Sequence, residues 1–159
     1  MKLTFNDYTL ETVYLHISDA QRLEVMDLWQ TENAITSAAE RERRSYEVVV
    51  MVRHVSGAVV GVSTVTVRTA SNGKRYYYYR MFIHSSHRVP YLMRAVTNAS
   101  RDFLATFRHP DGEVESFVVV TENPKLMRQG MRQLFERHGY TYKGKTSQGL
   151  DCWEYSFLQ

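Results

Sequence analysis

The stretch MFIHSSHRVPYLMRAV, residues 81–96, passes from an apolar strand through a polar, basic loop into a helix. The strand ends at Ile83, Arg88 lies in the loop, and Pro90 suits a first helical turn, where its missing N–H leaves no bond unmade. The pattern predicts a helix over about 89–107. Free amides and the dipole at a helix N-terminus favour an anion. Because the stretch contains no glycine, two interpretations stay open, an anion-binding loop or an ordinary turn.

The residues before this loop predict a three-stranded meander. Two valine-rich segments, 46–55 and 58–68, are separated by Ser56-Gly57, which is typical of an antiparallel hairpin. A second turn at Asn72-Gly73 leads into a strand over 75–83. In its run of four tyrosines, alternate side chains should point to opposite faces of the sheet.

The flanking segments complete an alternating order of strands and helices. Ser18 and Gln21 have the spacing of a capping box, which places a helix start between a strand and a second helix. The remaining elements are predicted over 9–17 (strand), 18–30 and 33–44 (helices), 114–121 (strand), 123–138 (helix), and 140–145 and 151–158 (strands). The order β-α-α-β-β-β-α-β-α-β-β predicts a mixed α/β (α+β) fold. Its central sheet is mostly antiparallel, with one parallel crossover, and is flanked by helices.

Composition restricts the class of protein. With 159 residues, 43% hydrophobic and 23% charged, the chain is expected to form a single globular domain over 1–159. No apolar run is long enough to cross a membrane, so no membrane partner is expected. The single cysteine, Cys152, cannot form an internal disulfide, which favours the cytoplasm. A net charge of +3 permits an acidic ligand without requiring one.

Two motifs carry a resemblance to a known family. LFERHGY (134–140), followed by two short strands ending in DCWEYSF, resembles the closing segment of the GNAT N-acetyltransferase superfamily. MFIHSSHR (81–88) resembles the strand of that family that pairs with pantetheine and leads into the pyrophosphate loop. The resemblance covers nearly the whole chain. It implies a GNAT-like sheet, acetyl-CoA or another acyl-CoA as cofactor, and direct transfer of the acyl group to a primary amine.

The resemblance also implies the residues that hold the cofactor. Arg88 matches the leading basic residue of the family's loop, while Tyr91 and Met93 stand where its glycines belong. Phe135 stands where many members carry the tyrosine that protonates the departing thiolate. The implied cofactor-binding residues are Phe82, Ile83, Arg88, Val89, Pro90, Tyr91, Leu92, Met93, Arg94 and Asn123.

Candidate catalytic residues follow from position and chemistry. Glu122 ends the strand over 114–121 and is the preferred general base, with His84 as a second candidate. Tyr140 or Tyr142, or water, is expected to replace the missing acid. His84 and His87 have HxxH spacing but no third ligand nearby, so no metal is predicted.

Three residues are candidate acceptor contacts. They are Trp29 and Asn33, around the segment that joins the first two helices, and Tyr78. The acceptor itself is expected to be a small-molecule or macromolecular amine.

A rival hypothesis is a non-catalytic GNAT-like module that binds a nucleotide, nucleic acid or protein partner. The missing glycines and the phenylalanine at position 135 favour it. The basic run with Arg41, Arg43 and Arg44 indicates a solvated helix face more than a nucleic-acid patch, although nucleic acid stays compatible with it. The sequence is equally compatible with a homodimer.

Overall fold

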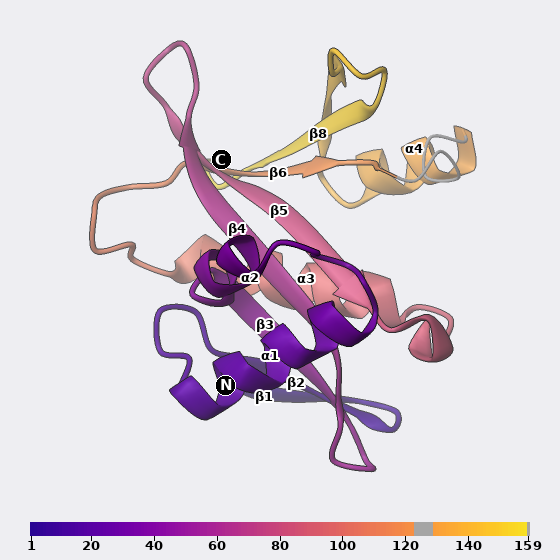
Figure 1. The fold of residues 1–159 in the computed structure, drawn as a ribbon. Coiled ribbons are helices and arrows are strands. Elements are labelled where there is room, and N and C mark those ends of the chain that lie inside the picture. The colour runs from indigo at the N-terminus through magenta and orange to yellow at the C-terminus, as the bar shows by residue number, and fades with distance from the viewer. Residues whose placement is uncertain (123–128, 159) are drawn as a thin grey trace. The chain divides into compact units, whose positions relative to one another are not determined.

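The computed structural model describes residues 1–122 and 129–158 of the chain. Its residues form two compact units, one from Met1–Val65 with Arg80–Phe107 and one from Thr66–Tyr79 with Arg108–Gln159. Two long strands, β4 (Val59–Thr69) and β5 (Arg75–Ile83), run through both (Figure 1). The single domain expected from the sequence stays a prediction.

The first unit is an antiparallel sheet with helices on both faces. Strand β1 (Lys2–Phe5) pairs with β2 (Tyr8–Thr12), β2 with β3 (Val48–His54), and β3 with β4. Helices α1 (Asp19–Thr31) and α2 (Ala38–Ser45) lie on one face, and α3 (Leu92–Thr106) lies on the other (Figure 1).

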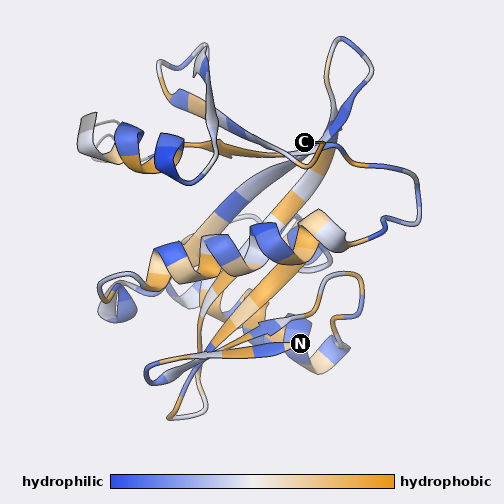
Figure 2. Cartoon of the chain, turned by 180° about the vertical axis from the view of Figure 1, so that it is seen from behind, coloured by the Kyte–Doolittle hydropathy of each residue, from blue (hydrophilic) through white to orange (hydrophobic). Residues whose placement is uncertain are grey.

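The core of this unit is built around β3. Its first five residues, VVVMV, are buried on both faces of the sheet, as expected for a central strand covered by helices. One face packs against Trp29 and Leu28 of α1, and the other faces α3. Figure 2 shows these strands mostly in orange, the colour of hydrophobic residues. The helix in front of them carries blue, hydrophilic segments on its outward turns.

The second unit contains the parallel pair. Strand β6 (Ser116–Val120) runs parallel to β5, with Tyr76 opposite Ser116 and Tyr79 opposite Val119. Strand β8 (Asp151–Ser156) pairs antiparallel with β6, and β7 (Thr141–Lys145) with β8, while α4 spans Gln129–Arg137. The strand order β1-β2-β3-β4-β5-β6-β8-β7 confirms the predicted mixed fold with one parallel crossover.

Several local predictions are confirmed at atomic detail. Ser18 Oγ accepts from the N–H of Gln21, and Gln21 Oε1 accepts from the N–H of Ser18, which is the predicted capping box. Gly73 has φ +84°, as the Asn-Gly turn requires. Tyr77 and Tyr79 are buried and Tyr76 and Tyr78 half-buried, so the tyrosine run alternates as predicted.

The N-terminal predictions need correction. Strand β1 was not predicted, and the strand expected over 9–17 ends at Thr12. The chain bends after that point, with Leu15 at φ +60°, an angle incompatible with a continuing strand. Helix α2 begins at Ala38 instead of 33, because Ser37 caps it by accepting from the N–H of Glu40. None of the helices in the described ranges combines the length and apolar character that crossing a membrane takes.

Candidate functional site

The candidate cofactor loop joins β5 to α3 within the first unit. Ile83 is buried, and Phe82 packs against the core on the α1 side of the sheet. After His84 the chain makes a short 3-10 turn, Ser85–His87, and reaches Arg88. Arg88 Nε donates to the carbonyl of Ile83 at 3.0 Å, and its guanidinium carbon lies 5.9 Å from the Phe82 ring centroid. Arg88 is exposed.

Helix α3 starts later than the sequence suggested. It begins at Leu92, and Tyr91 precedes it in the left-handed conformation with φ +66°. Pro90 therefore lies outside the helix, because the left-handed residue turns the chain between the two. The Leu92 N–H donates to the carbonyl of Val89 at 3.3 Å, which removes it from any ligand. Within the described chain, the amides of Met93 and Arg94 have no acceptor.

Tyr91 adopts the backbone conformation that glycine usually supplies. A left-handed angle costs a residue with a Cβ about 1–2 kcal/mol. The Tyr91 side chain is 67% exposed and leaves the turn, with the Arg94 guanidinium 5.1 Å from its ring centroid. Met93 is exposed as well. The loop thus makes the turn into the helix without a glycine, and both residues are exposed.

Two histidines of this loop, His84 and His87, cluster with His54 of β3. The Tyr8 hydroxyl is 3.0 Å from Nδ1 of His87, whose ring centroid is 4.9 Å from that of His54 and 5.6 Å from that of His84. Burial, followed by the charges of His54 and His84, lowers the pKa of His87 below its ordinary value. Sequence reasoning identified His84 and His87 but missed Tyr8 and His54, which no local pattern connects to them.

His84 has both ring nitrogens occupied. Its Nδ1 accepts from the N–H of Ser86 at 3.0 Å, and its Nε2 lies 3.2 Å from Glu32 Oε2. Since Nδ1 is the acceptor, Nε2 carries the hydrogen and donates to Glu32. Neither nitrogen can then take a proton from an amine, which weakens the case for His84 as the base. Among the described side chains, no three His, Cys, Asp or Glu residues form a group that could hold a metal ion.

The two acceptor candidates in this unit differ in exposure. Trp29 is 1% exposed and belongs to the core, so it offers no surface to a ligand, contrary to the prediction. Its ring lies 5.4 Å from the guanidinium carbon of Arg44. Asn33 is exposed, with φ +54°, in the segment between α1 and α2.

The remaining candidates lie in the second unit. Tyr78 is half-buried, with the guanidinium carbon of Arg68 3.8 Å from its ring centroid. Glu122 is exposed two residues after the end of β6. Asn123, and with it the predicted start of the following helix, lies outside the described residues.

Tyr140 and Phe135 belong to an aromatic cluster. Phe135 stacks on Trp153 with ring centroids 5.1 Å apart and planes at 13°. Tyr140 is 6% exposed and packs edge-on against Phe135 and Tyr155. This packing accounts for the aromatic character of position 135 without a catalytic role, and it surrounds Tyr140 with rings.

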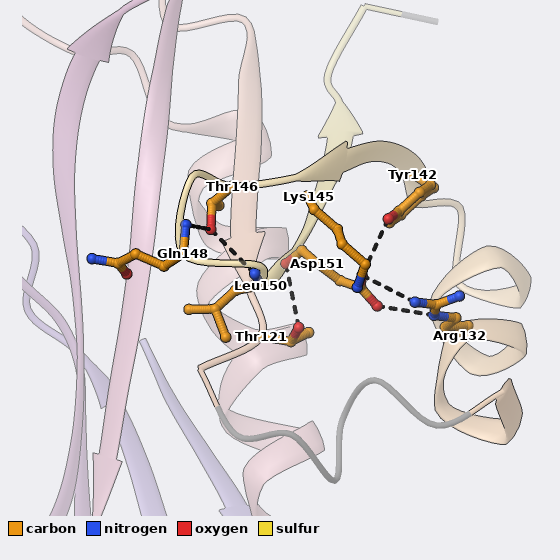
Figure 3. A network of polar contacts seen from close by, with 8 residues as sticks. All are labelled: Thr121, Arg132, Tyr142, Lys145, Thr146, Gln148, Leu150 and Asp151. Atoms are coloured by element: carbon orange, nitrogen blue, oxygen red, sulfur yellow. Dashed lines mark hydrogen bonds and ion pairs between the residues drawn. The ribbon is translucent and has the colours of Figure 1, made fainter.

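A buried carboxylate, that of Asp151 at the start of β8, joins side chains of α4 and β7 (Figure 3). Asp151 accepts from Arg132 Nε at 2.9 Å and Nη2 at 3.1 Å, from Lys145 Nζ at 3.1 Å and from the Tyr142 hydroxyl at 3.1 Å. Its backbone carbonyl accepts from the N–H of Thr121, the residue before Glu122. Tyr142 thus already donates its proton to Asp151. No local pattern in the sequence indicates this network, which joins α4, β7 and β8.

Neither a scan against protein-family models nor a search of curated proteins gives a match. Solved structures do match. A GNAT-family acetyltransferase from Listeria monocytogenes aligns over 98% of this chain and 99% of its own, with a TM-score of 0.63 and 16% identity. A ribosomal-protein-S5-alanine acetyltransferase from Vibrio fischeri aligns over 98% and 95%, with a TM-score of 0.66 and 11% identity. The chain has the GNAT fold.

A third structure matches this GNAT fold with a cofactor bound. It is a phosphinothricin acetyltransferase from Sinorhizobium meliloti in complex with AcCoA, aligned over 94% of this chain and 88% of its own, with a TM-score of 0.67 and 11% identity. In the GNAT fold of the present chain, the loop over 84–91 joins the first strand of the parallel pair to the crossover helix α3. The predicted strand-to-helix junction is therefore confirmed, and the roles of its residues stay predictions.

Proposed function

We propose that this protein transfers an acyl group, acetyl in the simplest case, from an acyl-CoA to a primary amine. The observation that carries the proposal is the β5–α3 loop. There, left-handed Tyr91 precedes two first-turn amides that have no acceptor among the described residues, and Arg88 of the same loop is exposed. Solved structures with the same fold support it, including the Sinorhizobium enzyme with AcCoA and Arabidopsis thaliana Naa50 with a bisubstrate analogue containing CoA.

In this proposal the loop holds the pyrophosphate of the cofactor. The amides of Met93 and Arg94 would donate to phosphate oxygens at the positive end of the α3 dipole. Arg88, held by its bond to the Ile83 carbonyl, would add a charge-assisted contact, and Arg94 a second positive charge. The β5 backbone beyond Tyr79, where the register with β6 ends, would pair with the pantetheine arm, as the family resemblance implies.

The proposed transfer is direct. The neutral amine attacks the thioester carbonyl, the C–N bond forms, and the C–S bond breaks to release the CoA thiolate. Glu122 is the proposed base that takes the amine proton, directly or through water. A thiol of pKa near 8.5 leaves readily as thiolate at neutral pH, so water suffices as the final proton donor. This accommodates Phe135, and it needs neither Tyr140 in its aromatic packing nor Tyr142 on Asp151.

The experiment is a calorimetric titration with acetyl-CoA and with CoA, followed by a thiol-release assay over a panel of primary amines. Arg88→Ala should weaken CoA binding by about 1.5–3 kcal/mol, the value of a charge-assisted contact, which is roughly ten- to a hundred-fold in Kd. Its melting temperature should stay close to that of the wild type, because the side chain is exposed.

Arg108→Ala is the matched control, since Arg108 is also exposed but lies outside the loop. Absence of any heat with millimolar acetyl-CoA would contradict the proposal. Binding without thiol release for any amine would instead favour the rival, a GNAT-like module that binds its ligand without turnover. That rival is favoured by the aromatic packing of Phe135 in place of an acid.

A further inference from the structure

Tyr91 combines a strained backbone conformation with a side chain that the fold does not use. Its φ of +66° is the left-handed angle at the turn into α3, which is unfavourable for a residue with a Cβ. Glycine, or an asparagine such as Asn6 or Asn33, adopts this conformation at less cost. The Tyr91 side chain is exposed, and in the described parts of the chain its hydroxyl has no hydrogen-bond partner. Neither core packing nor a hydrogen bond therefore accounts for a tyrosine at this position.

The Tyr91 ring lies beside the groups of the candidate anion site. Tyr91 is two residues before Met93, and the amides of Met93 and Arg94 have no acceptor among the described residues. The guanidinium carbon of Arg94 lies over the ring, 5.1 Å from its centroid. At this distance the guanidinium and the ring attract each other through a cation–π contact. The contact favours a ring position close to the start of α3, while the residue stays 67% exposed to solvent.

Two other exposed tyrosines have structural contacts that Tyr91 lacks. Tyr46, at the end of α2, lies under the guanidinium of the buried Arg22 of α1, at 3.7 Å. Tyr142 of β7 donates its hydroxyl to Asp151 of β8 at 3.1 Å. Each of these two rings thus joins separate elements of the fold. The guanidinium over Tyr91 comes from the adjoining helical turn, so that contact joins no separate elements.

An exposed aromatic ring beside an anion site suits a nucleotide. In acyl-CoA the pyrophosphate is joined through a ribose to adenine. A cofactor whose pyrophosphate binds the amides of Met93 and Arg94 therefore has its base within reach of a ring two residues away. Every base has a π-face that can stack on an aromatic side chain, and stacking needs no specific polar partner.

We propose that the Tyr91 ring stacks against the adenine of the acyl-CoA. The inference rests on the proposed function and narrows the acyl donor, because a donor that carries the nucleotide binds more tightly than an acyl-phosphopantetheine without it. A stacking role also accounts for the strained backbone. Glycine at position 91 would make the turn but would offer no surface to the base, whereas tyrosine supplies both.

The test compares three ligands that separate the parts of the cofactor. Acetyl-CoA, S-acetyl-4′-phosphopantetheine, which lacks the adenosine, and adenosine 3′,5′-bisphosphate, which lacks the pantetheine, are titrated by calorimetry. Tyr91→Ala keeps the left-handed strain and removes the ring. It should weaken binding of acetyl-CoA and of the bisphosphate about five- to a hundred-fold, the value of one base stacked on an aromatic side chain. Binding of the phosphopantetheine compound should not change, and Tyr91→Phe, which keeps the ring, should bind all three like the wild type.

Tyr46→Ala is the matched control, because Tyr46 is also exposed with an arginine over its ring but lies outside the loop. It should change none of the three affinities, and a thermal melt of each variant checks folding. Proton NMR of the bisphosphate gives a readout besides affinity. The ring current of a stacked aromatic side chain should shift the adenine proton signals upfield on binding to the wild type and to Tyr91→Phe, and not on binding to Tyr91→Ala.

The outcomes separate this inference from the proposed function. Unchanged acetyl-CoA binding in Tyr91→Ala, or an equal loss for acetyl-CoA and the phosphopantetheine compound, would overturn the inference while acyl transfer stands. Binding of the bisphosphate that depends on Tyr91, without binding of acetyl-CoA or release of thiol, would contradict the proposed function alone. If none of the three ligands binds the wild type, both are wrong.

Discussion

Replacing Asp151 by asparagine tests the network that closes the second unit. The substitution keeps the shape of the side chain and removes the charge that Arg132 and Lys145 share. Asparagine also turns a donor toward groups that are themselves donors. The Asp151 side chain is 0% exposed, so water cannot replace the lost interactions at the carboxylate. We expect a folded but clearly less stable protein.

The magnitude follows from the exposure of the partners. Removing one member of a buried ion pair costs about 3–5 kcal/mol when the other charge is left without solvent. The side chains of Arg132 and Lys145 are 39% and 51% exposed and recover part of their hydration, which lowers the expected loss. An expected loss of about 2–3 kcal/mol corresponds to a fall in Tm of roughly 5–10 °C for a chain of this length.

The assay is urea unfolding at several pH values. Burial raises the pKa of the Asp151 carboxyl, but the hydrogen bonds from Lys145, Arg132 and Tyr142 outweigh it and hold the pKa below its ordinary value of 3.8. The folded state thus binds the proton less readily than the unfolded state. The stabilisation is complete above that value and is lost as the pH falls through the folded pKa. The difference between wild type and Asp151→Asn should therefore be constant near neutrality and shrink in acid.

Lys143→Gln is the matched control in the same hairpin. Lys143 forms a partly exposed ion pair with Glu154 at 3.5 Å, which is worth at most about 1 kcal/mol. If Asp151→Asn costs no more than this control, or if its effect persists unchanged at low pH, the account of a charge-stabilised hairpin is wrong.

Two further predictions concern the cofactor loop. Tyr91→Gly should relieve about 1–2 kcal/mol of left-handed backbone strain, while the greater entropy of the unfolded chain costs about 0.5–1 kcal/mol. The Tm of this variant should therefore stay level or rise slightly. Tyr91→Ala keeps the strain and should show no gain in Tm. Burial and the charges of His54 and His84 lower the pKa of His87 in the folded state. Below about pH 6.5 the unfolded state therefore binds more protons than the folded state. The free energy of unfolding should fall as the pH drops from 7.5 toward 5.5. His87→Gln should flatten this dependence, and the exposed His16→Gln should leave it as steep as in the wild type.

Much of the fold was predictable because it is specified locally. The hairpin of β3 and β4 follows from two valine-rich runs around Ser56-Gly57, and the start of α1 from Ser18 and Gln21. Strand β1 was missed because its four residues, KLTF, show no such signal and are strand only through pairing with β2. The strand predicted over 9–17 is too long because strand residues are again decided by pairing. The apolar residues after Thr12 turn into the core instead of extending the sheet.

The candidate site was predictable in place but not in detail. The strand end at Ile83 and the helix after it could be identified from the sequence, but the left-handed Tyr91 could not, because tyrosine has no preference for that conformation. Arg44 was hidden for a different reason. In the run AERERR it resembles a solvated residue, and only contact with Thr64 on a distant strand turns it inward. Contacts of this kind depend on the tertiary fold and leave no local pattern.

Tyr91 illustrates how one position of a motif can change in sequence while the backbone conformation is kept. By the family resemblance, Tyr91 stands where a glycine belongs, and we propose that this position needs a backbone that turns left-handed and stays open to a ligand. Both requirements concern the backbone. Tyr91 satisfies the first at φ +66° and the second by projecting its ring to solvent beside Arg94. The chain thus makes this turn without a glycine, and it keeps the GNAT fold at 11–16% identity to the solved structures.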